Sequence, residues 1–233
     1  MSVESIAWKA LYAITKFILT ALSKVYLGYR AEGSENVPKV GGVIIACNHL
    51  SHLDPTLVGI GLPRHVFHIA KQELARVFFL RALFFIFGTI LIDRTKGKKA
   101  LETAREYLEK GRAIIIFPEG TRSTTGRLMK GKVGAALLAM KTGAPVVPAA
   151  IIGSDKCMPK HSRFIKPGKV LVKYGKPIYF ERVECEEIPR HLVWDATRLI
   201  MEKIEELLPE SMRPLPEEKL SFYSDILPEG ADA

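Results

Sequence analysis

Short apolar runs rich in β-branched residues alternate with segments of helical periodicity along most of the chain. The apolar runs predict strands over residues 43–47, 66–70, 89–93, 113–117, 146–152 and 169–174. The segments between and after them predict helices over residues 55–61, 72–86, 98–110, 131–142 and 190–208. Because such alternation is typical of βαβ units, we expect a single α/β layered domain with a largely parallel sheet flanked by helices.

Residues 5–26 form a long helical candidate whose circumference is mostly apolar. On a helical wheel the polar positions gather in one narrow stripe, made of Lys9, Lys16, Thr20, Ser23 and Lys24. This pattern favours an amphipathic helix that lies in a bilayer interface. The lysines argue against a spanning helix, and the lack of a small-residue cleavage site argues against a signal peptide. The alternative is a helix packed on the domain core.

The charge of the chain is unevenly distributed. The net charge is +9, yet residues 210–233 carry six acidic and two basic residues, so the positive excess lies elsewhere. A basic body indicates an anionic partner, and because no RNA-binding or recognition-helix signature is present, we expect lipid or an acidic protein rather than nucleic acid. We divide the chain into a membrane-anchoring helix (1–30), a folded domain (31–209) and an acidic, proline-containing tail without regular structure (210–233).

The cysteine content excludes a disulfide framework. Cys47, Cys157 and Cys185 are odd in number and far apart, which fits a reducing compartment. Cys47 falls inside an apolar run, so we interpret it as a core residue rather than a nucleophile.

A polar block follows the predicted strand 43–47. His49 lies at the end of that strand, where α/β folds place their chemistry, and Asp54 before Pro55 predicts a helix start with Asp54 as its N-cap. A strand–loop–helix bend can bring the Asp54 carboxylate to the His49 imidazole, and such a pair forms a general base. Two alternatives stay open: a mere cap beside a polar histidine, or a metal site that includes His52. The other histidines lack metal-site spacing, so we expect no metal.

Two further predicted strands lead into charged residues. One is followed by the block Phe117-Pro118-Glu119-Gly120-Thr121-Arg122-Ser123. Gly120 can adopt a positive φ, so that successive N–H groups converge as an anion nest, and the Arg122 guanidinium matches phosphate in bidentate fashion. Arg94 follows strand 89–93 and could join Arg122 around the same phosphomonoester. The alternatives are an ordinary Glu–Gly turn and a surface Asp93–Arg94 pair.

Four blocks occur in order along the chain: Asn48-His49 with Asp54, Gly88 to Arg94, Phe117 to Ser123, and Val147-Pro148. Together they resemble the four motifs of the glycerolipid acyltransferase family. This resemblance implies an acyltransferase domain in which His49 is the general base and Asp54 orients it. It also implies an acceptor-phosphate site made of Arg94, Glu119, Gly120, Thr121 and Arg122. Lys71 falls in another block that resembles the family, without an assigned role.

The resemblance implies transfer of a fatty acyl group from acyl-CoA or acyl carrier protein to the free hydroxyl of lysophosphatidic acid, giving phosphatidic acid. We expect no cofactor besides the acyl donor, and a monotopic protein at the cytoplasmic face of the cell membrane. Alternatives within the family are another lysophospholipid or glycerol 3-phosphate as acceptor. Alternatives from other classes are a non-catalytic membrane-surface binding protein and a metal-dependent phosphohydrolase.

A second apolar segment, residues 77–87, holds five phenylalanines in eleven residues. It predicts a core helix, the wall of an acyl-chain groove or a second membrane contact.

Overall fold

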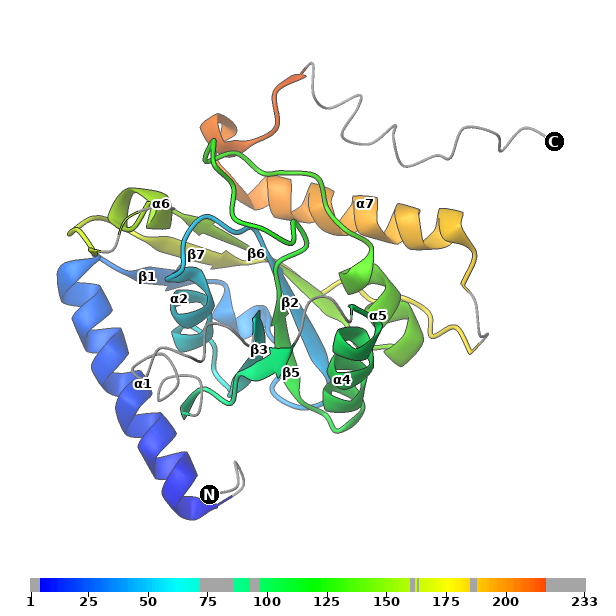
Figure 1. Cartoon of the computed structure of the whole chain (residues 1–233), viewed down its shortest axis with the longest axis horizontal. Helices are drawn as coiled ribbons and strands as arrows, with labels where there is room; N and C mark the ends of the chain where they lie inside the picture. The colour runs from blue at the N-terminus through cyan, green and yellow to red at the C-terminus, as the bar shows by residue number, and fades with distance from the viewer. Residues whose placement is uncertain are drawn as a thin grey trace.

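The computed structural model describes residues 5–71, 86–92, 97–159, 162, 164–184 and 188–216, without the side chains of 69–71, 90–92, 97 and 98. Within these ranges seven strands form one sheet in the order β1-β7-β6-β2-β5-β3-β4 (Figure 1). The strands are β1 (Arg30–Glu32), β2 (Val43–Cys47), β3 (Val66–Lys71), β4 (Ile90–Ile92), β5 (Ala113–Ile116), β6 (Val146–Ile152) and β7 (Leu171–Tyr174).

The sheet is largely parallel, as the sequence pattern predicts. Every neighbouring pair runs parallel except β6 and β7, which are antiparallel. β2 lies at the centre, where Ile45 faces Ile115 of β5 on one side and Val147 of β6 on the other. The pattern does not predict β1, because its three residues are exposed and carry no apolar run.

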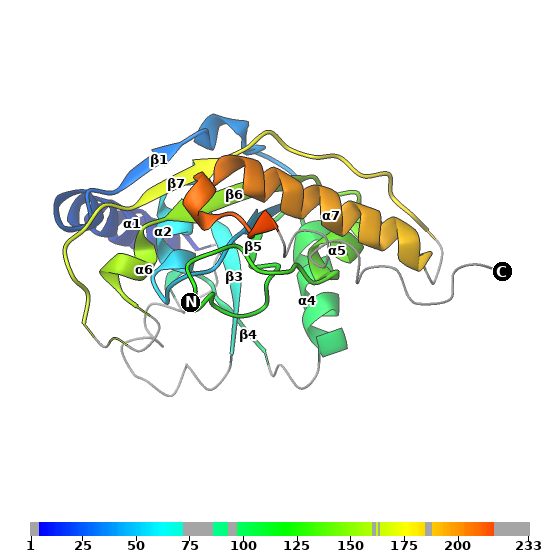
Figure 2. The same cartoon turned by 90° about the horizontal axis from the view of Figure 1, so that it is seen from above.

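Helices cover both faces of the sheet (Figures 1 and 2). Successive side chains of a strand point to opposite faces, so Ile44 and Ala46 pack into one core and Val43, Ile45 and Cys47 into the other. The first core is covered by α4 (Gly97–Glu109), α5 (Gly134–Thr142) and α7 (Arg190–Leu207). The second is covered by α1 (Ile6–Tyr26), α2 (Asp54–Ile60) and α6 (Ser154–Cys157).

One predicted helix differs in extent from the structure, and another falls mostly on residues that the structure does not describe. The helix expected over 131–142 begins only at Gly134, because the Lys132 N–H donates to the Pro118 carbonyl and holds that stretch in a loop. The helix expected over 72–86 lies outside the described residues except for its last position. The same holds for most of the phenylalanine-rich segment 77–87, so its role stays a prediction.

One side of α1 is packed on the domain. The Ser5 hydroxyl caps the helix by accepting the Trp8 N–H at 3.2 Å. Trp8 and Tyr12 are buried and stacked, with ring centroids 5.5 Å apart, and the His65 ring meets both edge-on. The Lys16 ammonium donates to the Leu62 carbonyl, and burial lowers the pKa of Lys16.

The opposite side of α1 is apolar and exposed. Exposed fractions are 74% for Phe17, 60% for Leu22 and 88% for Val25. The predicted polar stripe therefore does not point outward as a unit. Lys16 faces the domain, where its ammonium group donates to the Leu62 carbonyl. Lys24 remains exposed at the last turn, where a cation suits the helix dipole.

Candidate active site

His49 lies two residues beyond the end of β2, in the loop that leads to α2. Its Nδ1 is 2.8 Å from Oδ2 of Asp54. The side chain of His49 is 16% exposed, whereas that of Asp54 is completely buried. When Nδ1 carries the proton and donates it to Asp54, the lone pair of the ring lies on Nε2. The structure thus brings together the two residues that the sequence predicts as a general base and its orienter.

The Asp54 carboxylate is held by the loop that precedes it. The same Oδ2 accepts the backbone N–H of Leu50 at 2.6 Å and that of Ser51 at 2.7 Å. The prediction that Asp54 caps α2 is wrong, because the helix starts at Asp54 with Leu53 in the N-cap position and no side-chain cap. The carboxylate turns back over the loop instead, where three donors fix the oxygen that meets the imidazole.

Phe117, directly after β5, packs against one face of the His49 imidazole. The His49 and Phe117 rings are stacked, with centroids 4.1 Å apart and planes at 21°. Stacking and the Asp54 hydrogen bond together leave the imidazole little freedom to rotate.

Glu119 joins the two loops of the site rather than opening toward solvent. It is 3% exposed, its Oε1 accepts the His49 N–H at 2.7 Å, and its Oε2 accepts the Met129 N–H at 3.0 Å. Burial raises the pKa of Glu119 to about 8. The Ser123 N–H closes the arrangement by donating to the His49 carbonyl at 2.8 Å. These contacts give Glu119 a positioning role, and the expected direct contact with phosphate stays a prediction.

Gly120 adopts the left-handed conformation that the sequence predicts, with φ +71°. Its N–H donates to the Phe117 carbonyl at 3.0 Å, so this N–H does not contribute to an anion nest as expected. A Cβ on Gly120 would lie 2.9 Å from the Lys132 ammonium nitrogen, which shows that the lysine side chain lies across the glycine. The local sequence pattern does not predict this role of Lys132, because twelve residues separate it from Gly120 and only the fold brings them together.

Arg122 lies close enough to the dyad for its charge to matter there. Burial lowers the pKa of Arg122, while the Asp54 charge raises it. Burial also lowers the pKa of His52, and the Arg122 charge acts in the same direction. Thr121 beside it is exposed. Arg94 lies outside the described residues, so its place at the site stays a prediction.

Known proteins similar to this chain show the family to which it belongs. A model of the Acyltransferase family matches residues 28–152. The chain belongs to the acyltransferase family. A 1-acyl-sn-glycerol-3-phosphate acyltransferase of Bacillus subtilis is 31% identical over 170 residues, 70% of this chain and 82% of that protein. The resemblance of the four sequence blocks to acyltransferase motifs is thereby confirmed.

A plant relative and a solved structure extend the likeness. A 1-acyl-sn-glycerol-3-phosphate acyltransferase of Cocos nucifera is 34% identical over 176 residues, 74% of this chain, which spans only 56% of that relative's length. The crystal structure of the 1-acyl-sn-glycerophosphate acyltransferase PlsC from Thermotoga maritima superposes with a TM-score of 0.68 at 30% identity. That match covers 86% of this chain and 79% of that one.

The loop that carries His49 is tied to its neighbours by Asn48 and Ser51. The Asn48 amide donates to the Ile151 carbonyl at 3.0 Å and accepts the Ile151 N–H at 2.8 Å, which locks the loop to β6. The Ser51 hydroxyl donates to the Met158 carbonyl at 2.9 Å, just beyond α6. Both contacts fix the start and the middle of the loop that carries His49.

A metal site and a nucleophilic cysteine have less support from the described residues. Among the described residues, no group of three or more His, Cys, Asp or Glu side chains is placed to hold a metal ion. Cys47 is completely buried and burial raises the pKa of its thiol well above the ordinary value, which agrees with a core residue. Lys71 ends β3, but its side chain lies outside the description.

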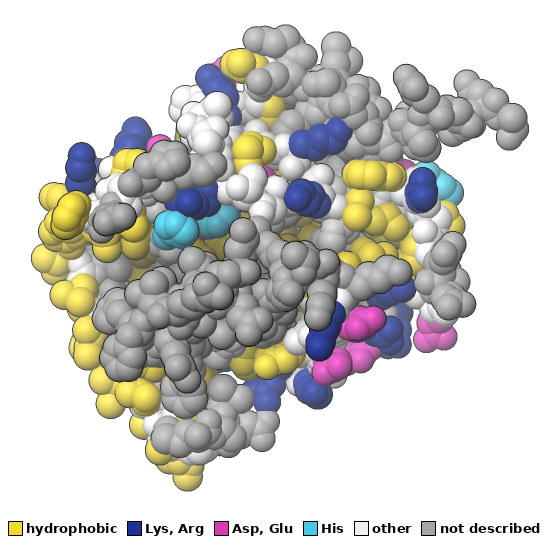
Figure 3. Space-filling view, viewed as in Figure 1, with side chains coloured by type: hydrophobic (Ala, Val, Ile, Leu, Met, Phe, Trp, Pro, Cys, Tyr) yellow, Lys and Arg dark blue, Asp and Glu magenta, His cyan; other side chains and the backbone are white. Residues whose placement is uncertain are grey.

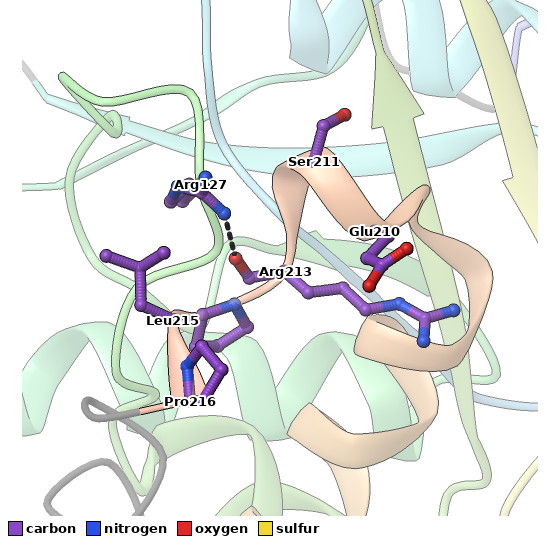
Figure 4. A pocket seen from close by; sticks show the side chains of 7 residues that line it. Arg127, Glu210, Ser211, Arg213, Leu215 and Pro216 are labelled. Carbon is purple, nitrogen blue, oxygen red and sulfur yellow. Dashed lines mark hydrogen bonds between the residues drawn. The ribbon is translucent and has the colours of Figure 1, made fainter.

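A cavity of about 490 Å³ lies between Arg127, in the loop that joins β5 to α5, and the segment that contains the 3₁₀ turn η4 (Glu210–Met212) (Figure 4). The Arg127 guanidinium donates to the Arg213 carbonyl, and the Leu128 N–H to the Met212 carbonyl, both at 2.8 Å. The start of the predicted tail therefore packs on the domain, while residues 217–233 lie outside the description. The lining contains no predicted site residue: Arg127, Glu210, Ser211, Arg213, Pro214, Leu215 and Pro216.

Proposed function

We propose that this acyltransferase moves a fatty acyl group from a thioester donor to the free hydroxyl of lysophosphatidic acid, giving phosphatidic acid. The observation that carries the proposal is the His49–Asp54 pair, held at 2.8 Å with the ring partly open to solvent and Arg122 nearby. Relatives named 1-acyl-sn-glycerol-3-phosphate acyltransferase support the choice of acceptor. Acyl-CoA and acyl carrier protein both remain candidate donors.

The chemistry follows from the fixed imidazole. Nε2 of His49 accepts the proton of the acceptor hydroxyl as its oxygen attacks the thioester carbonyl carbon. Asp54 keeps the ring in the required tautomer and stabilises the imidazolium that forms. The tetrahedral intermediate then expels the thiolate, which takes the proton back from Nε2. The ester and a free thiol result, and the protein returns to its starting state without a metal or cofactor.

The phosphate of the acceptor is proposed to bind beside Gly120. Arg122 supplies a guanidinium that can bind two phosphate oxygens, and the Lys132 ammonium, from the far end of the same loop, lies across Gly120. Glycine suits this position because φ is +71°, and a Cβ there would displace the end of the Lys132 side chain. Thr121 and Arg94 complete the proposed site, and Glu119 holds its loop against His49.

The acceptor lipid is proposed to reach the site from a bilayer on which α1 lies. Among the described residues α1 is the one helix long and apolar enough to cross a membrane. Its inner side is nevertheless tied to the domain by Trp8, Tyr12 and Lys16, which supports an interfacial rather than a spanning placement. The cytoplasmic face belongs to the same proposal, since Cys47 and Cys157 are free thiols.

The direct test is an assay of purified protein with lysophosphatidic acid and each thioester donor. Phosphatidic acid should form from at least one donor and should persist with a chelator present. Transfer only to another lysophospholipid or to glycerol 3-phosphate would replace the acceptor. Release of inorganic phosphate that a chelator abolishes would instead identify a metal-dependent phosphohydrolase.

A further inference from the structure

The segment Phe164–Lys169, here named the 164–169 loop, exposes two large apolar side chains between β6 and β7. Phe164 is 79% exposed and Ile165 is 44% exposed. Lys166 and Lys169 lie beside them and are also exposed, and the segment contains no acidic residue. An aromatic and an aliphatic side chain next to lysines form the pattern of an interfacial anchor, in which the apolar groups enter the acyl region and the ammonium groups stay with the headgroups.

The 164–169 loop continues the exposed face of α1 at its carboxyl end. The Tyr26 hydroxyl donates to the Ile165 carbonyl at 3.1 Å, and the Gly168 N–H donates to the Tyr26 carbonyl at 3.3 Å. Val25, one residue earlier on the helix, is 88% exposed. Figures 1 and 2 show this loop beside the end of α1, and Figure 3 shows hydrophobic side chains gathered along the margin where α1 runs.

The same loop is connected to the loop that carries the catalytic dyad. The Lys166 N–H donates to the Cys157 carbonyl at 2.8 Å, at the end of α6. The next carbonyl, that of Met158, accepts the Ser51 hydroxyl at 2.9 Å. Ser51 in turn donates its backbone N–H to Asp54. A short chain of hydrogen bonds therefore joins the exposed loop to the Asp54 carboxylate.

We propose that the 164–169 loop is a second membrane contact that inserts into an anionic bilayer beside α1. The proposal rests on the proposed membrane docking of α1 and adds an orientation to it. A single helix in the interface leaves the domain free to roll about the helix axis. A second contact at one end of the helix stops this rolling and sets the angle at which the dyad meets the lipid.

The lysines of the 164–169 loop favour an anionic partner. Lys166 and Lys169 suit anionic headgroups, with each lysine contributing about 1 kcal/mol near such a surface. A second copy of this chain docked symmetrically on the loop would place lysines against lysines. An apolar protein partner would leave both ammonium groups unpaired. An anionic bilayer satisfies the apolar and the basic side chains together.

Vesicle partitioning of the full chain tests the proposal. Phe164→Glu with Ile165→Glu should weaken binding to phosphatidylglycerol-containing vesicles by about tenfold, because two carboxylates replace buried apolar area. The matched control is Tyr179→Glu with Leu192→Glu, two exposed apolar side chains, which should bind like the parent. Lys166→Gln with Lys169→Gln should weaken binding to anionic vesicles by about thirtyfold and leave binding to neutral vesicles unchanged.

A fluorescent variant keeps the test independent of destabilising charges. Phe164→Trp should gain quenching by brominated lipids over the parent, whereas Tyr179→Trp should not. Parent-like binding of the Phe164/Ile165 variant, with no added quenching at position 164, would overturn the proposal. If Phe17→Glu with Leu22→Glu is released in the same experiment, the docking of α1 stands while the second contact fails. A parent that does not bind vesicles at all would refute both.

Discussion

The loop that carries His49 buries polar groups, whereas the outward face of α1 exposes apolar ones. In the loop, buried carboxylates accept N–H donors: Oδ2 of Asp54 accepts three, and the two oxygens of Glu119 accept one each. On α1, apolar groups such as Phe17 and Val25 are exposed to solvent in the part of the chain that the structure describes. Buried polar networks fix one geometry, whereas an exposed apolar face is stable only when something covers it.

This contrast separates two kinds of failure. A change in the dyad loop should disturb chemistry without changing where the protein is located. A change on α1 should alter location and leave the chemistry intact.

Asp54→Asn should lower kcat/KM by on the order of 10²–10⁴, because the amide favours the wrong tautomer of His49. It also presents an NH₂ group that cannot accept the N–H groups of Leu50 and Ser51. Asp195→Asn is the control, since Asp195 lies exposed on α7 and its side chain forms only a surface contact with Arg198. Steady-state kinetics on detergent-dispersed substrate measure the effect, and equal rates for both variants would break the link between the carboxylate and catalysis.

Phe17→Glu with Leu22→Glu should release the protein from vesicles, with partitioning reduced by at least about tenfold, because burial of each large apolar side chain contributes roughly 1.5–3 kcal/mol. Activity on detergent-dispersed lysolipid should stay near that of the parent, while turnover of bilayer-embedded substrate falls. Leu192→Glu, on the opposite side of the sheet, serves as control. A released variant that has also lost activity in detergent would contradict the separation of location from chemistry.

Lys132→Ala should raise the KM for lysophosphatidic acid by about tenfold and leave the KM for the thioester unchanged, because the ammonium binds a group that does not react. Lys132→Arg should recover part of the loss. Lys130→Ala, two residues away on the same exposed loop, should change neither constant by more than about twofold. A rise in the donor KM alone would move Lys132 from the acceptor site to the donor site.

The smallest effect concerns Glu119 and pH. Because burial raises the pKa of Glu119 to about 8, the folded chain keeps a proton that the unfolded chain releases above about pH 4.5. The free energy of unfolding should therefore fall as pH rises toward 8, by up to about 2 kcal/mol between pH 6.5 and 8. Denaturant titrations of the parent and of Glu119→Gln measure this, and the variant should lack the fall.

Two buried histidines give the free energy of unfolding the opposite pH dependence below about pH 6.5. Burial lowers the pKa values of His65 and His68 to about 4, so the unfolded chain binds protons between pH 4 and 6.5 that the folded chain does not. Their contribution makes stability rise with pH in that range, opposite to that of Glu119. An equal fall above pH 6.5 in the parent and in Glu119→Gln would show that Glu119 is not its source.

Local patterns were enough for much of the fold and for the identity of the dyad. Apolar runs predict the core strands, because burial on both faces of a sheet requires them. The His49–Asp54 spacing predicts their contact, since a strand–loop–helix bend of this length can bring the carboxylate back to the imidazole. Asp54 was nonetheless expected as a helix cap, and its carboxylate was found to accept the N–H groups that precede it.

Long-range contacts could not be predicted from local pattern. Glu119 reaches the His49 N–H only because β2 pairs with β5, and Lys132 reaches Gly120 only because the long loop between β5 and α5 folds back on itself. The side chain of Lys16 points toward the domain, which the local pattern does not predict either. A helical wheel shows that polar residues share a stripe, but only packing decides whether that stripe faces lipid or, as here, a backbone carbonyl of the domain.

The most direct test of the central claim compares His49→Ala with His52→Ala. Both histidines lie in one loop, but only His49 contacts Asp54, and the His52 side chain is exposed. Removal of His49 should lower kcat for acyl transfer to lysophosphatidic acid by at least about 10³, with the circular dichroism spectrum unchanged. Removal of His52 should cost no more than a few-fold. A folded His49→Ala protein that transfers acyl groups at a rate near that of the parent would contradict the account.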